Sequence, residues 1–226
     1  MRGPSHRFNW LRENRWRAVA FVVGSLFPLL WFGAIAEDLL EDKAFAYDAT
    51  IMDWIHTWAS ERTDRLMHAI SKAGQNWGVV PLDFAVAAFL LARRRWHTAY
   101  FWAAAIGGTA LLNVAAKHQF ARVRPEVWAM ASEPSFSFPS GHAMASMAAM
   151  AALAALLWHT RWRSTVLIVG GVFVPLVGVS RVYLGAHYPS DVFAGWALSF
   201  GWVIGCASLM WGSLASPLSG VARPSA

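Results

Sequence analysis

Charged residues are scarce in this sequence. Asp, Glu, Lys and Arg make up only 14% of the 226 residues, whereas 57% are hydrophobic. Soluble domains usually carry about 25% charged residues. The deficit excludes an ordinary soluble domain and indicates a chain whose main solvent is lipid. The 14 Trp residues agree with this interpretation, because Trp is enriched where a membrane meets water.

Cysteine is also nearly absent, and the basic residues form no single patch. Cys206 has no partner cysteine, so an intramolecular disulfide is excluded and the redox compartment is not indicated. The net charge is +6, but short basic clusters alternate with apolar runs, which is typical of cytoplasmic loops and argues against nucleic-acid binding. The clusters are Arg12, Arg15 and Arg17; Arg93, Arg94 and Arg95; and Arg161 and Arg163.

Six apolar runs approach the length of about 20 residues that a helix needs to cross the hydrocarbon core. They are residues 18–36, 79–92, 98–116, 143–158, 164–180 and 192–211. We therefore predict an all-α fold, a polytopic membrane helix bundle of about six transmembrane helices, with residues 1–226 as a single domain. Asp83 lies inside the second run and is expected to face another helix, because a carboxylate is costly in lipid.

The basic clusters predict the orientation in the membrane. With six spans, the tail 1–17 and the two later clusters fall on one side, which the positive-inside rule makes cytoplasmic, together with both chain ends. The acid-rich segment 37–76 then falls outside. Residues 34–36 read Ala-Ile-Ala and resemble a signal-peptidase site, but the preceding apolar run is long for a signal peptide. We predict that the first span is retained.

The outer segment 37–76 carries apolar residues at helix-like spacing, which predicts one or two short amphipathic helices. Such helices either lie on the membrane surface or pack as a cap over the bundle, and both arrangements fit the pattern. This segment is also a candidate for holding acyl chains. The apolar residues are Ile51, Trp54, Ile55, Trp58, Leu66, Met67 and Ile70.

Polar residues gather at the outer ends of the last four spans. They form the segments KHQFARVRP at 117–125, PSGH at 139–142 and SRVYLGAHYPSD at 180–191. Lys117, Arg122 and Arg124 have an ordinary explanation as interfacial cations that snorkel. The positive-inside bias, however, argues against three cations at an outer boundary. We therefore predict that the three segments form one site.

Phosphoryl transfer is the chemistry that these residue types favour. Lys117 and Arg124 are seven positions apart and would project from one face of a continuous helix. Arg181 would add a third cationic contact, and the planar arginine fork matches phosphate geometry. Ser140 and Gly141 stand where the fourth span begins, so that free N–H groups there favour an anion.

Two histidines suggest a division of labour between a nucleophile and an acid. Asp191, four residues after His187, is the nearest carboxylate able to orient either imidazole. We therefore predict His187 as the nucleophile, Asp191 as its orienting group and His142 as the general acid. The same three side chains are also of the types that bind zinc, but the surrounding cations Lys117, Arg124 and Arg181 would repel a metal. No metal or cofactor is expected.

The spacing K-x6-R-P, P-S-G-H and S-R-x5-H-x3-D resembles the motifs of the type 2 phosphatidic acid phosphatases, or lipid phosphate phosphatases. All three motifs are present in order and together cover residues 117–191. The matching residues are Lys117, Arg124 and Pro125; Pro139, Ser140, Gly141 and His142; and Ser180, Arg181, His187 and Asp191.

The resemblance implies a phosphohistidine on His187, His142 as acid, and no metal. It also implies a core shared with glucose-6-phosphatase-like enzymes and vanadium haloperoxidases, in a bacterial inner membrane with the site facing the periplasm. Family substrates are phosphatidic acid, phosphatidylglycerol phosphate, undecaprenyl pyrophosphate and lipid A phosphates. Here we expect undecaprenyl pyrophosphate or phosphatidylglycerol phosphate, so the expected partners are a phospholipid or polyprenyl phosphate and the bilayer.

Three functions remain open from the sequence. The first is hydrolysis of a lipid phosphate monoester or pyrophosphate, including that of lipid A. The second is a phosphotransferase that uses the same phosphohistidine, and the third is a non-catalytic lipid-binding protein, which the two histidines and Asp191 disfavour. The loop 126–138, with Trp128, Met130, Phe136 and Phe138, is expected to border the cleft. The oligomeric state is not indicated.

Overall fold

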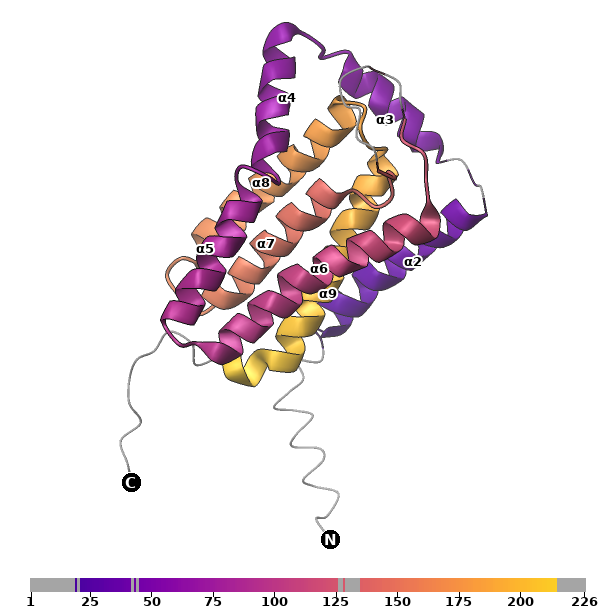
Figure 1. The fold of residues 1–226 in the computed structure, drawn as a ribbon. Helices are drawn as coiled ribbons and strands as arrows, with labels where there is room; N and C mark the ends of the chain where they lie inside the picture. The colour runs from indigo at the N-terminus through magenta and orange to yellow at the C-terminus, as the bar shows by residue number, and fades with distance from the viewer. Residues whose placement is uncertain are drawn as a thin grey trace, which may run out of the picture.

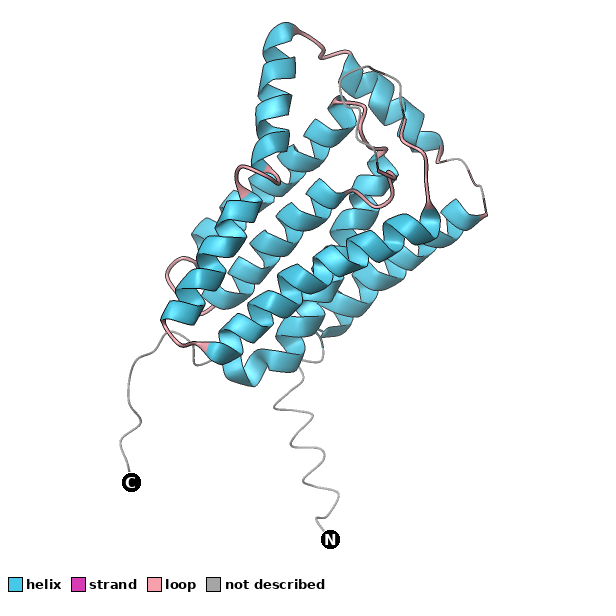
Figure 2. Cartoon of the chain, viewed as in Figure 1, coloured by secondary structure: helices cyan, strands magenta, loops and turns pink. Residues whose placement is uncertain are grey.

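Every regular element that the structure describes is a helix, which confirms the all-α prediction (Figures 1 and 2). The structure is a computed structural model that describes residues 19, 21–41, 43, 45–125, 128 and 135–214, with side chains through residue 210. The predicted tail 1–17 and most of the loop 126–134, with Met130, lie outside this part. The helices are η1 (Val22–Leu26), α2 (Phe27–Leu40), α3 (Ala46–His56), α4 (Glu61–Ala73), α5 (Val79–Ala92), α6 (Trp96–Phe120), α7 (Gly141–Leu157), α8 (Arg163–Tyr183) and α9 (Pro189–Leu214).

The six predicted apolar runs all fall on helices. Among the described residues, four helices are long and apolar enough to cross a membrane, namely Val22–Leu40, Trp96–Phe120, Arg163–Tyr183 and Pro189–Met210. The other two runs form the shorter apolar helices α5 and α7, so the six-span layout stays a prediction. The first helix continues to Leu40, and Glu37 and Asp38 therefore belong to its last turns. The predicted first run ended at Ala36, four residues before the end of this helix, while the placement of segment 37–76 on the outer side stays a prediction.

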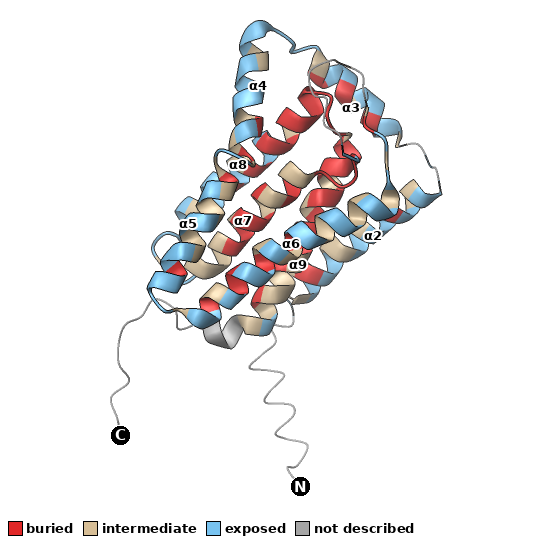
Figure 3. Cartoon of the chain, in the orientation of Figure 1, coloured by how far each residue is buried: buried red, intermediate tan, exposed pale blue. Residues whose placement is uncertain are grey.

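Helix α7 lies at the centre of the bundle, packed against α6, α8 and α9, while α9 also packs against α2 (Figure 1). Small side chains allow these close approaches, and Ala149 and Ala152 of α7 are completely buried. Figure 3 shows the buried residues concentrated in α7, α9 and one half of α8, whereas α5 and α4 are mostly exposed. The best-packed part of the bundle is therefore the part that carries the second and third sequence motifs.

Helices α3 and α4 form a cap at one end of the bundle. Helix α3 packs against α8 and α9, and α4 packs against α8. Met52, Ile55 and Met67 are buried. Trp54 and Leu66 are more than half exposed. The apolar residues that predicted these helices from the sequence therefore do not all lie on the buried faces. The two short helices are as predicted, and their packing follows the cap alternative.

The arginine-rich turns lie away from this cap. The turn between α5 and α6 holds Arg93, Arg94 and Arg95, and the turn between α7 and α8 precedes Arg163. Both turns lie at the end of the bundle opposite α3 and α4 (Figure 1). This separation agrees with the charge asymmetry from which the orientation was predicted, and the orientation itself stays a prediction.

Asp83 is half-buried on α5, the helix that packs against α6 and α7. Its Oδ1 atom is buried and has no hydrogen-bond partner within the described residues. Trp102 of α6 donates its indole N–H to the backbone carbonyl of Asp83 (3.1 Å). Asp83 is therefore partly shielded inside the protein on a helix that packs against two others, as expected for a carboxylate inside an apolar run.

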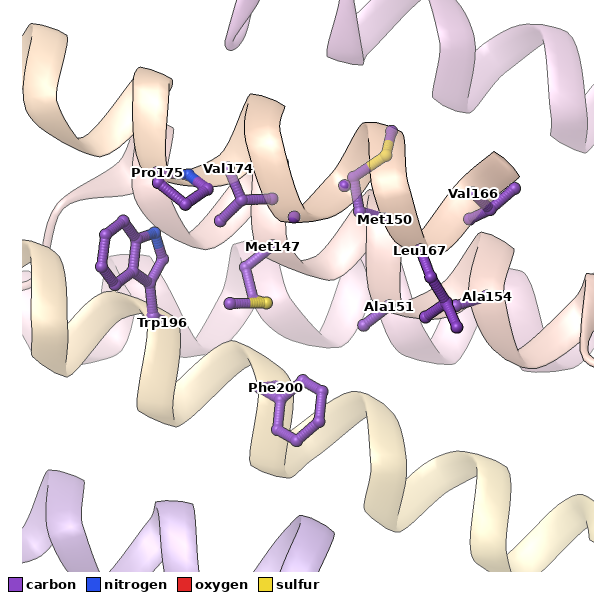
Figure 4. A pocket seen from close by; sticks show the side chains of 12 residues that line it. Met147, Met150, Ala151, Ala154, Val166, Leu167, Val174, Pro175, Trp196 and Phe200 are labelled. Carbon is purple, nitrogen blue, oxygen red and sulfur yellow. The ribbon is translucent and has the colours of Figure 1, made fainter. Parts of the chain in front are cut away.

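A groove of about 300 Å³ crosses α7 between α8 and α9 (Figure 4). Its lining is almost entirely apolar, and none of the predicted site residues belongs to it. Met147 and Met150 form part of its floor, and Trp196 and Phe200 line the α9 side. The groove is therefore separate from the predicted site.

Gly178 sets the distance between α8 and α9 just below the predicted site. A methyl group there would overlap Cζ2 of Trp196 and would lie 2.7 Å from Cγ1 of Val192. We expect Gly178→Ala to lower the apparent melting temperature in detergent, because overpacking of this kind costs about 1–3 kcal/mol. Gly171→Ala on the same helix is the control, since a methyl group there meets nothing within 4 Å. Equal melting temperatures for the two variants would contradict the packing argument.

Candidate active site

Backbone and amide hydrogen bonds join the three motif segments at the end of the bundle below the cap. The Ser140 N–H donates to the carbonyl of Asp191 (3.1 Å), and the Ser137 N–H donates to that of Arg122 (2.9 Å). Asn113 of α6 donates its side-chain amide to the carbonyl of Pro139 (3.2 Å). The predicted convergence of the three segments is therefore present in the structure.

Lys117 and Arg124 do not lie on one continuous helix, and that expectation was wrong. Helix α6 ends at Phe120, and Ala121 follows with a left-handed backbone (φ 44°) while its N–H donates to the Lys117 carbonyl. This is a common way for a helix to stop, and the chain then runs on to Pro125 without helix.

The two cations nevertheless reach the same short segment. Lys117 Nζ donates to Oγ of Ser135 (3.1 Å) and to the carbonyl of Phe136 (2.6 Å). Arg124 donates through Nε to the Ser135 carbonyl (2.7 Å) and through Nη2 to Ser135 Oγ (2.9 Å). Lys117 from the end of the helix and Arg124 from the irregular segment after it therefore reach the same residues from different elements.

His187 is buried, with 1% of its side chain exposed. Its Nε2 atom lies 3.2 Å from Nη1 of Arg124. A guanidinium only donates hydrogen bonds, so Nε2 is the unprotonated nitrogen and Nδ1 carries the proton. Nδ1 faces Oδ2 of Asp191 at 3.5 Å. The ring therefore presents a lone pair on the side of Arg124, and this is the tautomer that a nucleophilic Nε2 requires.

Asp191 is completely inaccessible and is held by several donors. Its Oδ1 accepts from Nη1 of Arg122 (2.6 Å), and its Oδ2 accepts from the backbone N–H of Tyr188 (2.9 Å). The second bond reaches back across the first turn of α9, as in a capping box. Asp191 is thus both the acid at the start of the last helix and the carboxylate next to His187.

Arg181 and Arg124 are buried, with 3% and 9% exposed. Arg181 donates through Nη1 to Oγ of Ser71 on α4 (2.6 Å). Arg124 donates through Nη1 to the carbonyl of Ala186 (2.6 Å). Buried guanidinium groups need such acceptors because desolvation of an unpaired charge is costly. The cap helix α4 therefore helps to fix a predicted site residue.

The start of α7 holds the second motif. Ser140 is the N-cap residue, and its Oγ is buried without a hydrogen-bond partner in the described part of the chain. Gly141 is followed by His142, which is partly exposed in the first helical turn. A methyl group at Gly141 would lie 3.3 Å from Oδ1 of Asn113. Gly141 therefore also allows α6 and α7 to approach closely, a reason that the sequence reading did not include.

Asp48 and Ser71 belong to this site and were missed from the sequence. Both come from the cap, and both are buried. A signal was present, because Asp48 shares a helical face with the buried Met52 and Ile55, at spacings of four and seven. Ser71 likewise follows the buried Met67 by four positions. A polar residue on the buried face of an amphipathic helix needs a partner.

The polar atoms of Asp191 and His187 have guanidinium groups of the protein as neighbours. Oδ1 of Asp191 faces the Arg122 guanidinium, and Nε2 of His187 faces that of Arg124. Within the described residues, no three His, Cys, Asp or Glu side chains gather as a ligand set. The donor atoms of His187 and Asp191 are therefore arranged toward cations of the protein itself.

Residues 96–214 match the family model of the PAP2 superfamily. The chain belongs to the PAP2 superfamily. It is 32% identical over 180 residues to phosphatidylglycerophosphatase B of Bacillus subtilis (strain 168), a match that covers 76% of this chain and 86% of that protein. It is also 30% identical over 136 residues to an undecaprenyl-diphosphatase of Sulfolobus acidocaldarius, covering 59% of this chain and 64% of that protein.

Solved structures agree with this membership. The crystal structure of a transmembrane PAP2 type phosphatidylglycerolphosphate phosphatase from Bacillus subtilis has a TM-score of 0.70 and 28% sequence identity, covering 83% of this chain and 94% of that chain. Aquifex aeolicus LpxE is similar in fold, with a TM-score of 0.54 and 24% identity, covering 73% and 96%. The resemblance drawn from the three motifs is thereby confirmed, and this PAP2 protein is a membrane protein.

Proposed function

We propose that this PAP2 protein is a metal-independent lipid phosphatase that works through a phosphohistidine on His187. One observation carries the proposal, namely that Nε2 of His187 faces the Arg124 guanidinium at 3.2 Å while Nδ1 faces Asp191. A cation next to the lone pair marks the position where a phosphoryl group would meet both a guanidinium that balances the charge of its oxygens and the nucleophile that attacks its phosphorus. Simple anion binding needs no such oriented imidazole.

In the first step the lone pair of Nε2 attacks phosphorus, and the bond from phosphorus to the lipid oxygen breaks. His142 gives its proton to that oxygen, so the lipid leaves as an alcohol or, from a pyrophosphate, as a monophosphate. Asp191 stabilises the positive charge that develops on the His187 ring. Lys117, Arg124 and Arg181 balance the charge on the phosphoryl oxygens, aided by Ser140 and Gly141 at the start of α7.

In the second step water attacks the phosphohistidine. His142, now neutral, takes a proton from the water, and the bond between phosphorus and Nε2 breaks. Inorganic phosphate leaves and His187 returns to its starting tautomer. Atoms and charges balance over the two steps without a metal ion, and the acid of the first step is the base of the second.

The substrate class is proposed from the relatives. Phosphatidylglycerophosphatase B of Bacillus subtilis matches over most of both chains, which favours phosphatidylglycerol phosphate. The undecaprenyl-diphosphatase of Sulfolobus acidocaldarius supports polyprenyl pyrophosphate as the second candidate. We further propose that the site faces the periplasm of a bacterial inner membrane with both chain ends in the cytoplasm, because the arginine-rich turns lie at the opposite end of the bundle.

Phosphate release by the detergent-purified protein tests the function. The panel holds phosphatidylglycerol phosphate, undecaprenyl pyrophosphate, phosphatidic acid and a lipid A phosphate, each with EDTA present. We expect release from at least one lipid at a rate that EDTA does not change, and its loss in His187→Ala. The control is His159→Ala, in the turn that follows α7. Transfer of the phosphoryl group to an added alcohol without free phosphate would indicate a phosphotransferase, and EDTA-sensitive release would contradict the metal-free mechanism.

The leaving group tests the role of His142. We expect His142→Ala to slow hydrolysis of alkyl phosphates by about 10²–10⁴-fold, the usual contribution of a positioned acid. Aryl phosphates with acidic phenols should lose much less, since their oxygen leaves without a proton. The measurement is kcat/KM for an alkyl and an aryl phosphate in the variant and in the unchanged protein. Equal losses on both substrates would refute the assignment of His142 as general acid.

A further inference from the structure

Arg122 lies between two buried carboxylates at the junction of the cap and the bundle. Its Nη1 donates to Oδ1 of Asp191 (2.6 Å), and its Nη2 donates to Oδ2 of Asp48 (3.0 Å). The exposed side-chain fractions are 14% for Arg122, 6% for Asp48 and 0% for Asp191. The three charges are thus largely removed from water, so their mutual orientation is set by these contacts rather than averaged by solvent.

The guanidinium plane of Arg122 is also held by aromatic rings. Its Cζ lies 3.9 Å from the ring centre of Tyr188 and 5.5 Å from that of Phe45. Stacking of this kind is specific to arginine, because a lysine ammonium has no plane to stack. Tyr188 directly precedes α9, and its backbone N–H also contacts Asp191. The same short segment therefore fixes both the cation and the carboxylate.

Asp48 is tied to α9 by a second set of bonds. Its Oδ1 accepts from the backbone N–H of Ser190 (2.8 Å), and its Oδ2 accepts from the Ser190 hydroxyl. Ser190 is the residue before Asp191 and also accepts from Nη1 of Arg122 (2.7 Å). Asp48 thus holds the first turn of α9 and Arg122 at the same time, although it is 142 residues away from Ser190 in the chain.

The geometry separates Arg122 from the cations assigned to the phosphoryl group. Both of its terminal nitrogens donate to carboxylates. Lys117 and Arg124 instead contact the segment at Ser135 and Phe136, and Arg124 faces the lone pair of His187. A guanidinium neutralised by two carboxylates attracts an anion weakly. Its contacts are those of a group that orients Asp191.

We propose that Asp48 and Arg122 are a positioning pair that holds Asp191 against His187. The inference rests on the proposed function in taking Nε2 of His187 as the nucleophile. The chain of contacts runs from Asp48 on α3 through Arg122 to Asp191 and then to the imidazole. The proposal gives the cap helix α3 a part in the reaction, because α3 supplies Asp48, whose carboxylate accepts the hydrogen bond from Nη2 of Arg122.

Kinetics of two variants that each remove one charge test the pair. We expect Asp48→Asn and Arg122→Gln each to lower kcat by about 10–100-fold, the size of effect known for the loss of an outer hydrogen-bond partner that orients an active-site histidine. Inhibition by orthovanadate should stay within twofold, because neither side chain contacts the anion. The matched controls are Asp53→Asn on the exposed face of α3 and Arg62→Gln on the exposed face of α4, both expected to leave kcat unchanged.

A charge-preserving variant separates positioning from electrostatics. Arg122→Lys keeps the charge but cannot donate to both carboxylates in one plane, so we expect a loss close to that of Arg122→Gln. A kcat near that of the unchanged protein would show that only charge matters and would overturn the proposal. Orthovanadate inhibition that weakens in step with kcat would also overturn it, because Arg122 would then bind the anion.

The double variant Asp48→Asn/Arg122→Gln adds a second criterion. Because both residues are proposed to act through Asp191, the combined loss in kcat should be much smaller than the product of the single losses. If the two residues acted independently, the loss in kcat of the double variant would equal the product of the two single losses. That result would contradict a single chain of contacts through Asp191.

The ring of His187 gives a measurement that does not depend on turnover. In protein labelled with ¹⁵N-histidine, long-range proton–nitrogen spectra report which ring nitrogen carries the proton. We expect His187 to be protonated at Nδ1 in the unchanged protein and in Asp53→Asn, and to show a mixture of tautomers in Arg122→Gln and Asp48→Asn. If no lipid in the panel is hydrolysed but the tautomer shifts, the proposed function fails and the positioning pair stands. If the lipids are hydrolysed but neither kcat nor the tautomer changes in the variants, the positioning pair fails alone.

Discussion

A carboxylate with no exposure to water must be compensated inside the protein, and much of this site follows from that requirement at Asp191. Removing an unpaired charge from water costs several kcal/mol. Asp191 meets the cost with the Arg122 guanidinium and the Tyr188 N–H. The guanidinium in turn needs Asp48, and Asp48 brings the cap helix α3 onto the first turn of α9. His187 precedes Asp191 by four residues in the chain, and its Nδ1 atom lies 3.5 Å from the Asp191 carboxylate.

Lipid as the main solvent explains the contrast between the two parts of the molecule. The bundle helices are apolar on their outer faces, for example at Leu30, Phe84 and Leu111, because hydrocarbon rather than water surrounds them. Small side chains, as on α7, bring the helices close together where lipid gives no hydrophobic drive for association. Polar groups that the chemistry needs are collected at one end, where helix termini leave N–H groups unpaired.

Much of this arrangement could be predicted from local patterns in the sequence. Within the described residues, the apolar runs placed the bundle helices, and the motifs marked the three segments that hydrogen bonds join at one end of the bundle. Both signals depend on residues a few positions apart. Local patterns misjudged where helices end. Helix α2 passes Ala36 and continues to Leu40, and α6 stops at Phe120, so that Arg124 leaves the face it was expected to share with Lys117. Caps and packing, rather than composition, decide such ends.

The partners of the buried charges were beyond reach for a different reason. Asp48 contacts Arg122 at a separation of 74 residues, and Ser71 contacts Arg181 at a separation of 110. Their places on the buried faces of α3 and α4 indicate that each needs a partner but not which residue that partner is. Only the packing of the cap on the bundle gives them partners, and no spacing rule within one segment describes such a contact.

The central claim is that Nε2 of His187 carries the phosphoryl group, and trapping that intermediate tests it most directly. The protein would be mixed with a ³²P-labelled lipid phosphate that it hydrolyses, quenched within milliseconds in alkali, and digested for mass spectrometry. The account predicts an alkali-stable, acid-labile phosphoryl group on His187 that forms at least as fast as phosphate is released. Turnover without any phosphorylated residue, or with the phosphoryl group on another side chain, would contradict it.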